Sequence, residues 1–159
     1  MDTNFQGLFG EQKLILELIK NNFDVFSSIS GKSKVDLVAI KNNIVFRFQV
    51  KSCNSINKYG TYEIQLKSVR PNRTENVIHK FDGLSCDILV AYCSSHDVLQ
   101  YFTCLELDNR SQLNINPENF DANSINKILR DYTQNILPDN AEDEDIVQTT
   151  TSNGSGNWE

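Results

Sequence analysis

The hydrophobic pattern is most regular on either side of the polar pair Asn42-Asn43. The flanking runs, residues 35–40 and 44–50, are rich in β-branched and aromatic residues, which is typical of strands. Two asparagines tolerate the positive φ angles of a two-residue hairpin turn. We therefore predict a β-hairpin over residues 34–52, with the two asparagines as its turn.

The register of this hairpin brings three polar side chains together. With the asparagines as turn residues, Asp36 lies directly opposite Gln49, and directly opposed residues share a face of the hairpin. Side chains alternate along a strand, so Lys51 lies on the same face as Gln49, whereas Phe48 and Val50 lie on the core face. We therefore expect an aspartate, an amide and a lysine side by side on the polar face.

Elsewhere the spacing of apolar residues predicts further helices and strands. A 3.6-residue period indicates an amphipathic helix, whereas alternation or a short apolar run indicates a strand. We expect helices over 10–22, 74–81 and 121–136, strands over 23–29, 59–66, 87–93 and 98–104, and irregular structure over 105–120. Thr74 is a suitable N-cap for the middle helix. Helices and strands thus alternate along the chain, which indicates a single α/β domain.

The first predicted helix carries an acid on its apolar side. Glu11 lies three residues before Leu14 and seven before Leu18, so it belongs to the apolar stripe. An acid in the first turn of a helix can simply serve the helix dipole or a cap. A carboxylate that faces a sheet must also meet a cation or a hydrogen-bond donor, which favours a functional role.

The distribution of charge changes what the net charge implies. A formal charge of -6 argues at first against a nucleic-acid ligand. Six of the 21 acids follow Pro138, whereas no Lys or Arg follows Arg130, so residues 1–138 carry 15 acids and 15 bases. Within them, residues 51–80 hold six basic and two acidic residues. Such a basic strip is suited to a phosphate backbone.

Several classes of protein are excluded by what the sequence lacks. At 159 residues the chain is long enough for one domain, and without a membrane-spanning run or signal peptide we expect a soluble, cytoplasmic protein. The four cysteines form no C-x-x-C pair and are expected to be reduced. Gly31-Lys32-Ser33 lacks the upstream glycine of a P-loop, so we expect no nucleotide cofactor. Residues 139–159 read as an acidic tail rich in Ser, Thr, Gly and Asn.

An aspartate, a hairpin and a second strand ending in acid-x-Lys resemble the PD-(D/E)XK nuclease superfamily. Here the pattern is Val35-Asp36 followed by Gln49-Val50-Lys51, with Val35 in place of the proline and Gln49 in place of the second acid. The Gln-x-Lys variant, the chain length and the placing of Glu11 resemble the bacterial group I intron-encoded homing endonucleases of this superfamily. The resemblance covers residues 10–104. It implies a nuclease domain over residues 1–138 with a restriction-endonuclease-like core, α-β-β-β-α-β, in which helices flank a central mixed sheet.

The resemblance also implies a set of site residues. The catalytic residues would be Glu11, Asp36, Gln49 and Lys51, and the first three would hold Mg²⁺, for which Mn²⁺ is a substitute. Glu11 would return the charge that Gln49 lacks, and Lys51 would stabilise the anionic transition state. A purely structural Asp-Lys pair is the alternative interpretation.

The implied function is site-specific cleavage of double-stranded DNA. One chain has one site, so cutting both strands implies a homo-oligomer, either a dimer or a tetramer. A Holliday-junction resolvase, a restriction-type nuclease and a non-catalytic DNA-binding module of the same fold are the alternatives. Candidate DNA contacts are Lys32, Lys34, Lys58, Tyr59, Tyr62, Gln65, Lys67, Arg70 and Arg73. His79 and His96 receive no role.

Overall fold

The structure is a computed structural model that describes residues 3–29, 33–71 and 76–136. Its helices and strands in chain order are α1 (Thr3–Lys20), β1 (Asp24–Ser27), β2 (Leu37–Lys41), β3 (Ile44–Cys53), β4 (Tyr62–Gln65), β5 (Ser68–Pro71), β6 (Asn76–His79), β7 (Ile88–Cys93), β8 (Val98–Thr103), β9 (Gln112–Ile115) and α2 (Ile125–Ile136). Short 3-10 helices, Ser94–His96, Leu105–Leu107 and Pro117–Asn123, follow β7, β8 and β9. The expectations for Lys32, Arg73 and the tail over residues 139–159 fall outside the described residues.

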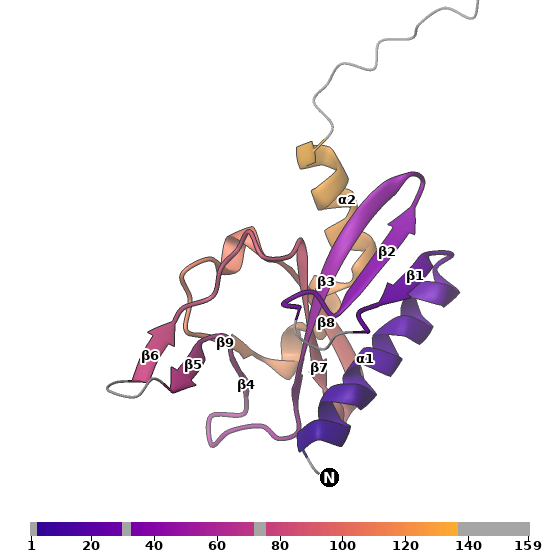
Figure 1. The fold of residues 1–159 in the computed structure, drawn as a ribbon. Coiled ribbons are helices and arrows are strands. Elements are labelled where there is room, and N and C mark those ends of the chain that lie inside the picture. Colours follow the sequence, from indigo (N-terminus) through magenta and orange to yellow (C-terminus); the bar gives the residue numbers. More distant parts are fainter. Residues whose placement is uncertain (1–2, 30–32, 72–75, 137–159) are drawn as a thin grey trace, which may run out of the picture.

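Five strands form the central sheet in the order β1-β2-β3-β7-β8 (Figure 1). Neighbouring strands are antiparallel except β3 and β7, which run parallel. A parallel pair needs a long crossover connection, and residues 54–87 supply it. The expected single α/β domain with a mixed central sheet is confirmed.

The β2–β3 hairpin forms with the expected turn and register. Lys41 pairs with Ile44, and Asn42 and Asn43 between them have φ angles of 51° and 61°. Positive φ at both central residues is the geometry of a type I′ turn, whose twist matches that of the flanking strands. Phe48 is fully buried, as its place on the core face of the hairpin requires.

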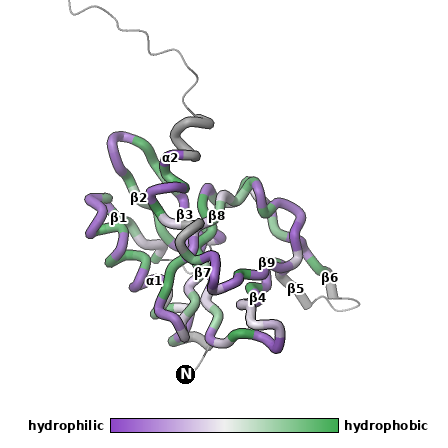
Figure 2. Tube along the Cα trace, turned by 180° about the vertical axis from the view of Figure 1, so that it is seen from behind, coloured by the Kyte–Doolittle hydropathy of each residue, from purple (hydrophilic) through white to green (hydrophobic). Residues whose placement is uncertain are grey.

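Both helices cover the same face of the sheet. Leu14 and Leu18 of α1 and Ile125 and Ile128 of α2 share one buried cluster with Phe48. Along α1, hydrophilic and hydrophobic stretches alternate, as the period of a half-buried helix requires (Figure 2). Neither α1 nor α2, the long helices of the described chain, is apolar enough to cross a membrane.

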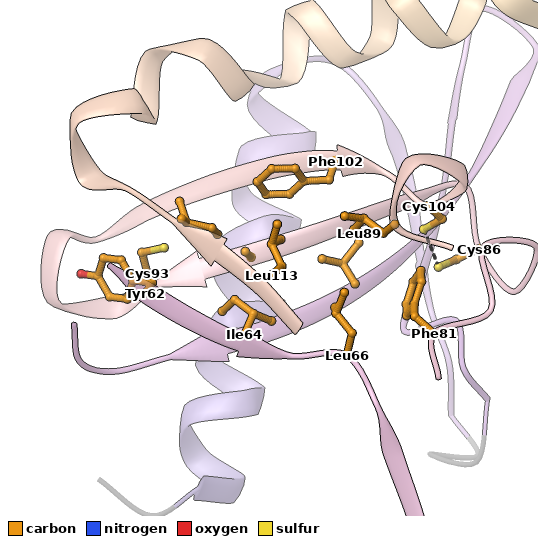
Figure 3. Packing of buried hydrophobic residues seen from close by; sticks show 13 residues of the cluster. Tyr62, Ile64, Leu66, Phe81, Cys86, Leu89, Cys93, Phe102, Cys104 and Leu113 are labelled. Carbon is orange, nitrogen blue, oxygen red and sulfur yellow. Dashed lines mark hydrogen bonds between the residues drawn. The ribbon is translucent and has the colours of Figure 1, made fainter. Parts of the chain in front are cut away.

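The opposite face of the sheet is covered by strands. β4 and β9 pair as a separate two-stranded sheet, and their inward side chains join a second buried cluster with β7. Figure 3 shows Ile64 of β4, Leu113 of β9 and Leu89 of β7 meeting between the two layers. The side chains of Gln49 and Lys51 lie on this second face, because they pair in register with β7 residues of the same cluster.

The expectation of a helix over residues 74–81 is wrong. Asn76–His79 form β6, which pairs with β5 as a ribbon on the side of the molecule away from α1 (Figure 1). A helix of this length is marginal on its own, whereas Val77-Ile78 are β-branched and favour a strand once β5 offers backbone partners. Residues 105–120, expected to be irregular, contain β9.

Candidate functional site

Asp36 lies beside the C-terminal half of β3, one residue before the first paired residue of β2. β2 begins at Leu37, which pairs with Phe48, so β3 continues beyond the start of its partner. The Asp36 N–H donates to the Phe48 carbonyl at 2.9 Å, and the Asp36 carboxylate accepts the Val50 N–H at 2.7 Å. The side chain thus replaces the backbone acceptor that β2 does not supply, which holds the carboxylate against β3.

Lys51 is the cation next to this carboxylate. Burial raises the pKa of Asp36 above its usual range, although the Val50 N–H and the charge of Lys51 oppose the shift. Lys51 itself is half-buried on β3, in register with Ala91 of β7. The strand therefore presents a partly buried ammonium beside a partly buried carboxylate.

Glu11 reaches the same edge because α1 approaches β3 closely at Gly10. A Cβ atom on Gly10 would collide with Ser52 Oγ and would lie 3.3 Å from Val50 Cγ1. Glycine has no Cβ, so the helix backbone can lie against the end of β3. Glu11, the next residue, lies close enough to Asp36 for the two charges to interact.

The Glu11–Asp36 pair fits a divalent cation. Burial, and after it the negative charge of Asp36, raises the pKa of Glu11 above its usual range. A cation between two such carboxylates would relieve both their repulsion and their lost hydration, and carboxylate oxygens are ligands that Mg²⁺ prefers. Among the described residues, no group of three or more His, Cys, Asp or Glu side chains is arranged to hold a metal. An ion here would need neutral donors as well.

Gln49 offers such a donor and has a partner that the sequence did not reveal. Its Oε1 lies 3.9 Å from the Sγ of Cys86. The Sγ of Cys86 in turn lies 2.8 Å from the Sγ of Cys104, and Figure 3 shows this second contact. All four cysteines are free, as expected for reduced thiols. The Cys86 thiol is a weak hydrogen-bond donor, so it orients the Gln49 amide with little competition for a stronger ligand.

The four predicted site residues are linked in pairs near one end of β3. Asp36 interacts through its charge with Glu11 and with Lys51, and Lys51 lines one pocket with Gln49 on the second face of the sheet. Through Asp36 and Lys51, the structure therefore connects an acid of α1 with the polar side chains of β3. Their catalytic roles stay a prediction.

The candidate DNA contacts differ in exposure. Those with exposed side chains are Lys34, Lys58, Tyr59, Gln65 and Lys67. The prediction for Tyr62 is wrong, because this side chain is fully buried and its hydroxyl hydrogen-bonds with Ser95 and His96. Alternation along β4 explains the difference, since Tyr62 points into the second cluster and Gln65 points outward. Arg70 lies in β5, but its side chain is outside the described part of the chain.

Comparisons with known proteins identify the family of the chain and a solved structure with a similar fold. Residues 1–134 match the family described as PD-(D/E)XK endonuclease. A solved structure with a similar fold is that of a bacterial homing endonuclease, I-Ssp6803I, with 24% sequence identity and a TM-score of 0.67. The likeness covers 72% of this chain and 78% of that one, and at this identity it shows the fold alone. No curated protein matches the chain at a significant level.

Proposed function

Because the chain belongs to the PD-(D/E)XK endonuclease family, we propose that it hydrolyses phosphodiester bonds in double-stranded DNA at specific sites, as a homing endonuclease. One observation carries the proposal. Glu11 and Asp36, two acids with raised pKa values, lie together at the end of β3 beside Lys51. This combination offers ligands for a cation and a positive charge for a phosphate in one place.

Glu11, Asp36 and Gln49 would hold the metal ion, for which Mg²⁺ is the proposed species. When bound, the ion supplies a Lewis acid that withdraws negative charge from the phosphate. Glu11 and Asp36 would bind the cation as ionised carboxylates, and because their pKa values are raised, protons compete with the cation up to a higher pH than at ordinary acids. Gln49 contributes oxygen without charge, so the site gains a ligand and avoids a third carboxylate.

Lys51 would act on the phosphate and on the attacking water. Its ammonium stabilises the negative charge that grows on the phosphate oxygens in the transition state, and it favours the ionised form of a water held beside it. Asp36 positions this ammonium by its charge, while the backbone bond from Val50 keeps the Asp36 carboxylate in place. Loss of Lys51 should therefore reduce the rate of cleavage more than the affinity for DNA.

The proposal includes self-association, because one chain has one site and a duplex has two strands. Helix α1 offers a surface suited to a second copy of the chain. Besides its buried stripe, this helix exposes a second row of large apolar side chains on one side: Phe5, Leu8, Phe9, Leu16 and Ile19. A symmetric contact between two such rows would bury them and would pair two sites, in a dimer or within a tetramer.

Cleavage of a randomised or genomic duplex library tests the proposed function. Wild-type protein should cut the library at discrete sites with Mg²⁺ and should not cut it with EDTA. Lys51→Ala should cut at least about a hundredfold more slowly while it still binds duplex, since it lacks the transition-state charge. Lys127→Ala, which changes an exposed lysine of α2, is the matched control. Equal digestion by wild type and Lys51→Ala would overturn the proposal.

A further inference from the structure

A pocket of about 430 Å³ adjoins the proposed active site on the second face of the sheet. Gln49 and Lys51 of β3 form one of its walls, and His79 and Lys80, at and just after the end of β6, form another. The sequence pattern predicts a helix for the residues that form β6. It therefore does not indicate that His79 and Lys80 line the same pocket as Lys51. The pocket thus joins the site to the base of the β5–β6 ribbon.

The charges that line this pocket are mainly positive. Among the described residues, three lysines, Lys34, Lys51 and Lys80, line the pocket together with a single carboxylate, that of Asp82. The apolar part of the lining includes Leu66 and Phe81, whose side chains are buried. A cleft of one predominant charge with low-dielectric walls concentrates its field, which raises the local concentration of an anion.

Asp82 occupies part of this positive field. Its Oδ2 lies 3.2 Å from the Nζ of Lys34, and its Oδ1 accepts the Leu84 N–H at 3.1 Å. Both members of the ion pair are more than half exposed, so the pair contributes little free energy and can be exchanged. The hydrogen bond from the Leu84 N–H, and to a lesser extent the hydrogen bond from Lys34, lowers the pKa of Asp82. The Asp82 carboxylate is therefore negatively charged at neutral pH and competes with an incoming anion for Lys34.

We propose that the pocket binds a phosphate of the DNA backbone next to the phosphate that is cut. Lys80 and Lys34 hold this phosphate, and Lys34 exchanges Asp82 for it. The inference rests on the proposed nuclease function, because Lys51 serves both the pocket and the scissile phosphate. It assigns a binding role to the chain segment after β6 and makes Asp82 an internal competitor of DNA.

Two substitutions of opposite effect test this inference. Binding of the full chain to a mixed-sequence duplex of about 30 base pairs is measured by fluorescence anisotropy in EDTA, from about 50 to about 300 mM NaCl. Lys80→Gln should weaken binding roughly tenfold near 100 mM salt and should lower the slope of log affinity against log salt by about one. Asp82→Asn should tighten binding, because it removes the charge yet keeps the oxygen that accepts the Leu84 N–H.

Lys127→Gln on α2 is the matched control, since this exposed lysine lies on the helix-covered side of the sheet. It should leave both affinity and slope unchanged. An unchanged slope in Lys80→Gln, or no gain in Asp82→Asn, would overturn the inference even if wild type cuts DNA. If both variants show the expected changes in DNA binding but the wild type never cuts DNA, the proposed function alone would be overturned. Wild type that binds no duplex would overturn both.

Discussion

At the scale of single residues, the site places two acids where neither is fully hydrated. Burial is the largest cause of the raised pKa of both Glu11 and Asp36. For an acid, a raised pKa means that the folded protein binds protons more tightly than the unfolded chain does. The metal-free protein is therefore less stable than it would be with neutral side chains at these positions, and a bound cation would restore the difference.

Substitution of Asp36 by asparagine should separate stability from activity. The amide of the variant keeps an oxygen that can accept the Val50 N–H but carries no charge to bury. Without metal at neutral pH, we expect the Tm of Asp36→Asn to rise by about 2 °C, while cleavage falls by at least about a hundredfold. Calorimetry and cleavage assays measure the two effects.

Asp82→Asn is the control for this comparison, because the pKa of Asp82 is lowered and its charge is favourable in the folded protein. It should bring no gain in Tm. A decrease in the Tm of metal-free Asp36→Asn would contradict the inferred cost of the buried carboxylate.

Metal binding should depend on pH in the direction set by the two raised pKa values. Both carboxylates release their protons at a higher pH than ordinary acids do, so affinity for Mg²⁺ should begin to fall at a correspondingly higher pH on acidification. In the absence of metal, the penalty in folding free energy is absent below the ordinary carboxyl pKa, grows as pH rises from there to the raised pKa, and is constant at higher pH. Calorimetric titration with Mg²⁺ across a pH series checks this. An affinity that stays constant down to the ordinary carboxyl range would argue against the pair as ligands.

At the scale of elements, the site depends on how closely α1 lies against β3. The contact at Gly10 positions Glu11, and the hairpin register positions Asp36 and Lys51. These two elements are separate in the sequence and share one buried cluster under the sheet. A small displacement of the helix would therefore move one acid relative to the other.

Two glycines of α1 test this dependence. Gly10→Ala should push the helix away from Ser52 and reduce cleavage by at least about tenfold, because misplacement of catalytic groups is costly. Gly7→Ala is the matched control, since a Cβ there meets nothing within 4 Å. It should keep full activity and stabilise the helix by up to about 1 kcal/mol. Equal activity of the two variants would show that the close approach does not matter.

The hairpin could be predicted from sequence because its information is local. Two asparagines fix the turn, the turn fixes the register, and the register places Asp36 near Lys51. Glu11 could be placed on the buried side by helical period alone. The distance between Glu11 and Asp36 depends on Gly10, which lets α1 lie close to β3. A glycine on the buried side of the predicted helix was the feature of the sequence that could have indicated this close contact.

The parts that could not be predicted depend on non-local pairing. β6 and β9 are strands of four residues whose partners, β5 and β4, supply their backbone hydrogen bonds. Such short segments have too little pattern to reveal their partner, and Val77-Ile78 fit a helix nearly as well as a strand. One face of β4 packs against the central sheet, so Tyr62 is a core residue. Lys80 follows β6, and because this strand was not predicted, the wall that Lys80 forms was not predicted either.

At the scale of the whole molecule, the proposed function needs two copies of the site. We expect the protein in solution to be a dimer or tetramer, as measured by analytical ultracentrifugation. Leu16, with 57% of its surface exposed, lies in the exposed apolar row of α1, so Leu16→Glu should cost the folded chain little and should disrupt the contact. The variant should sediment as a smaller species and should lose double-strand cleavage.

Leu105→Glu is the matched control, because Leu105 is 68% exposed and lies after β8, outside α1. It should sediment like the wild type. A wild-type monomer that still cuts both strands at working concentrations would contradict the proposed assembly, whereas an oligomer unaffected by Leu16→Glu would place its interface elsewhere.

The location of a bound divalent ion tests the central claim most directly. Crystals grown with Mn²⁺ should show an anomalous scattering peak at the edge of β3, within about 2.2 Å of an Asp36 carboxylate oxygen, with Glu11 as a direct or water-bridged ligand. The same peak should be absent from Asp36→Asn crystals. A wild-type map in which Mn²⁺ binds only elsewhere, with Glu11 and Asp36 holding no ion between them, would contradict the account.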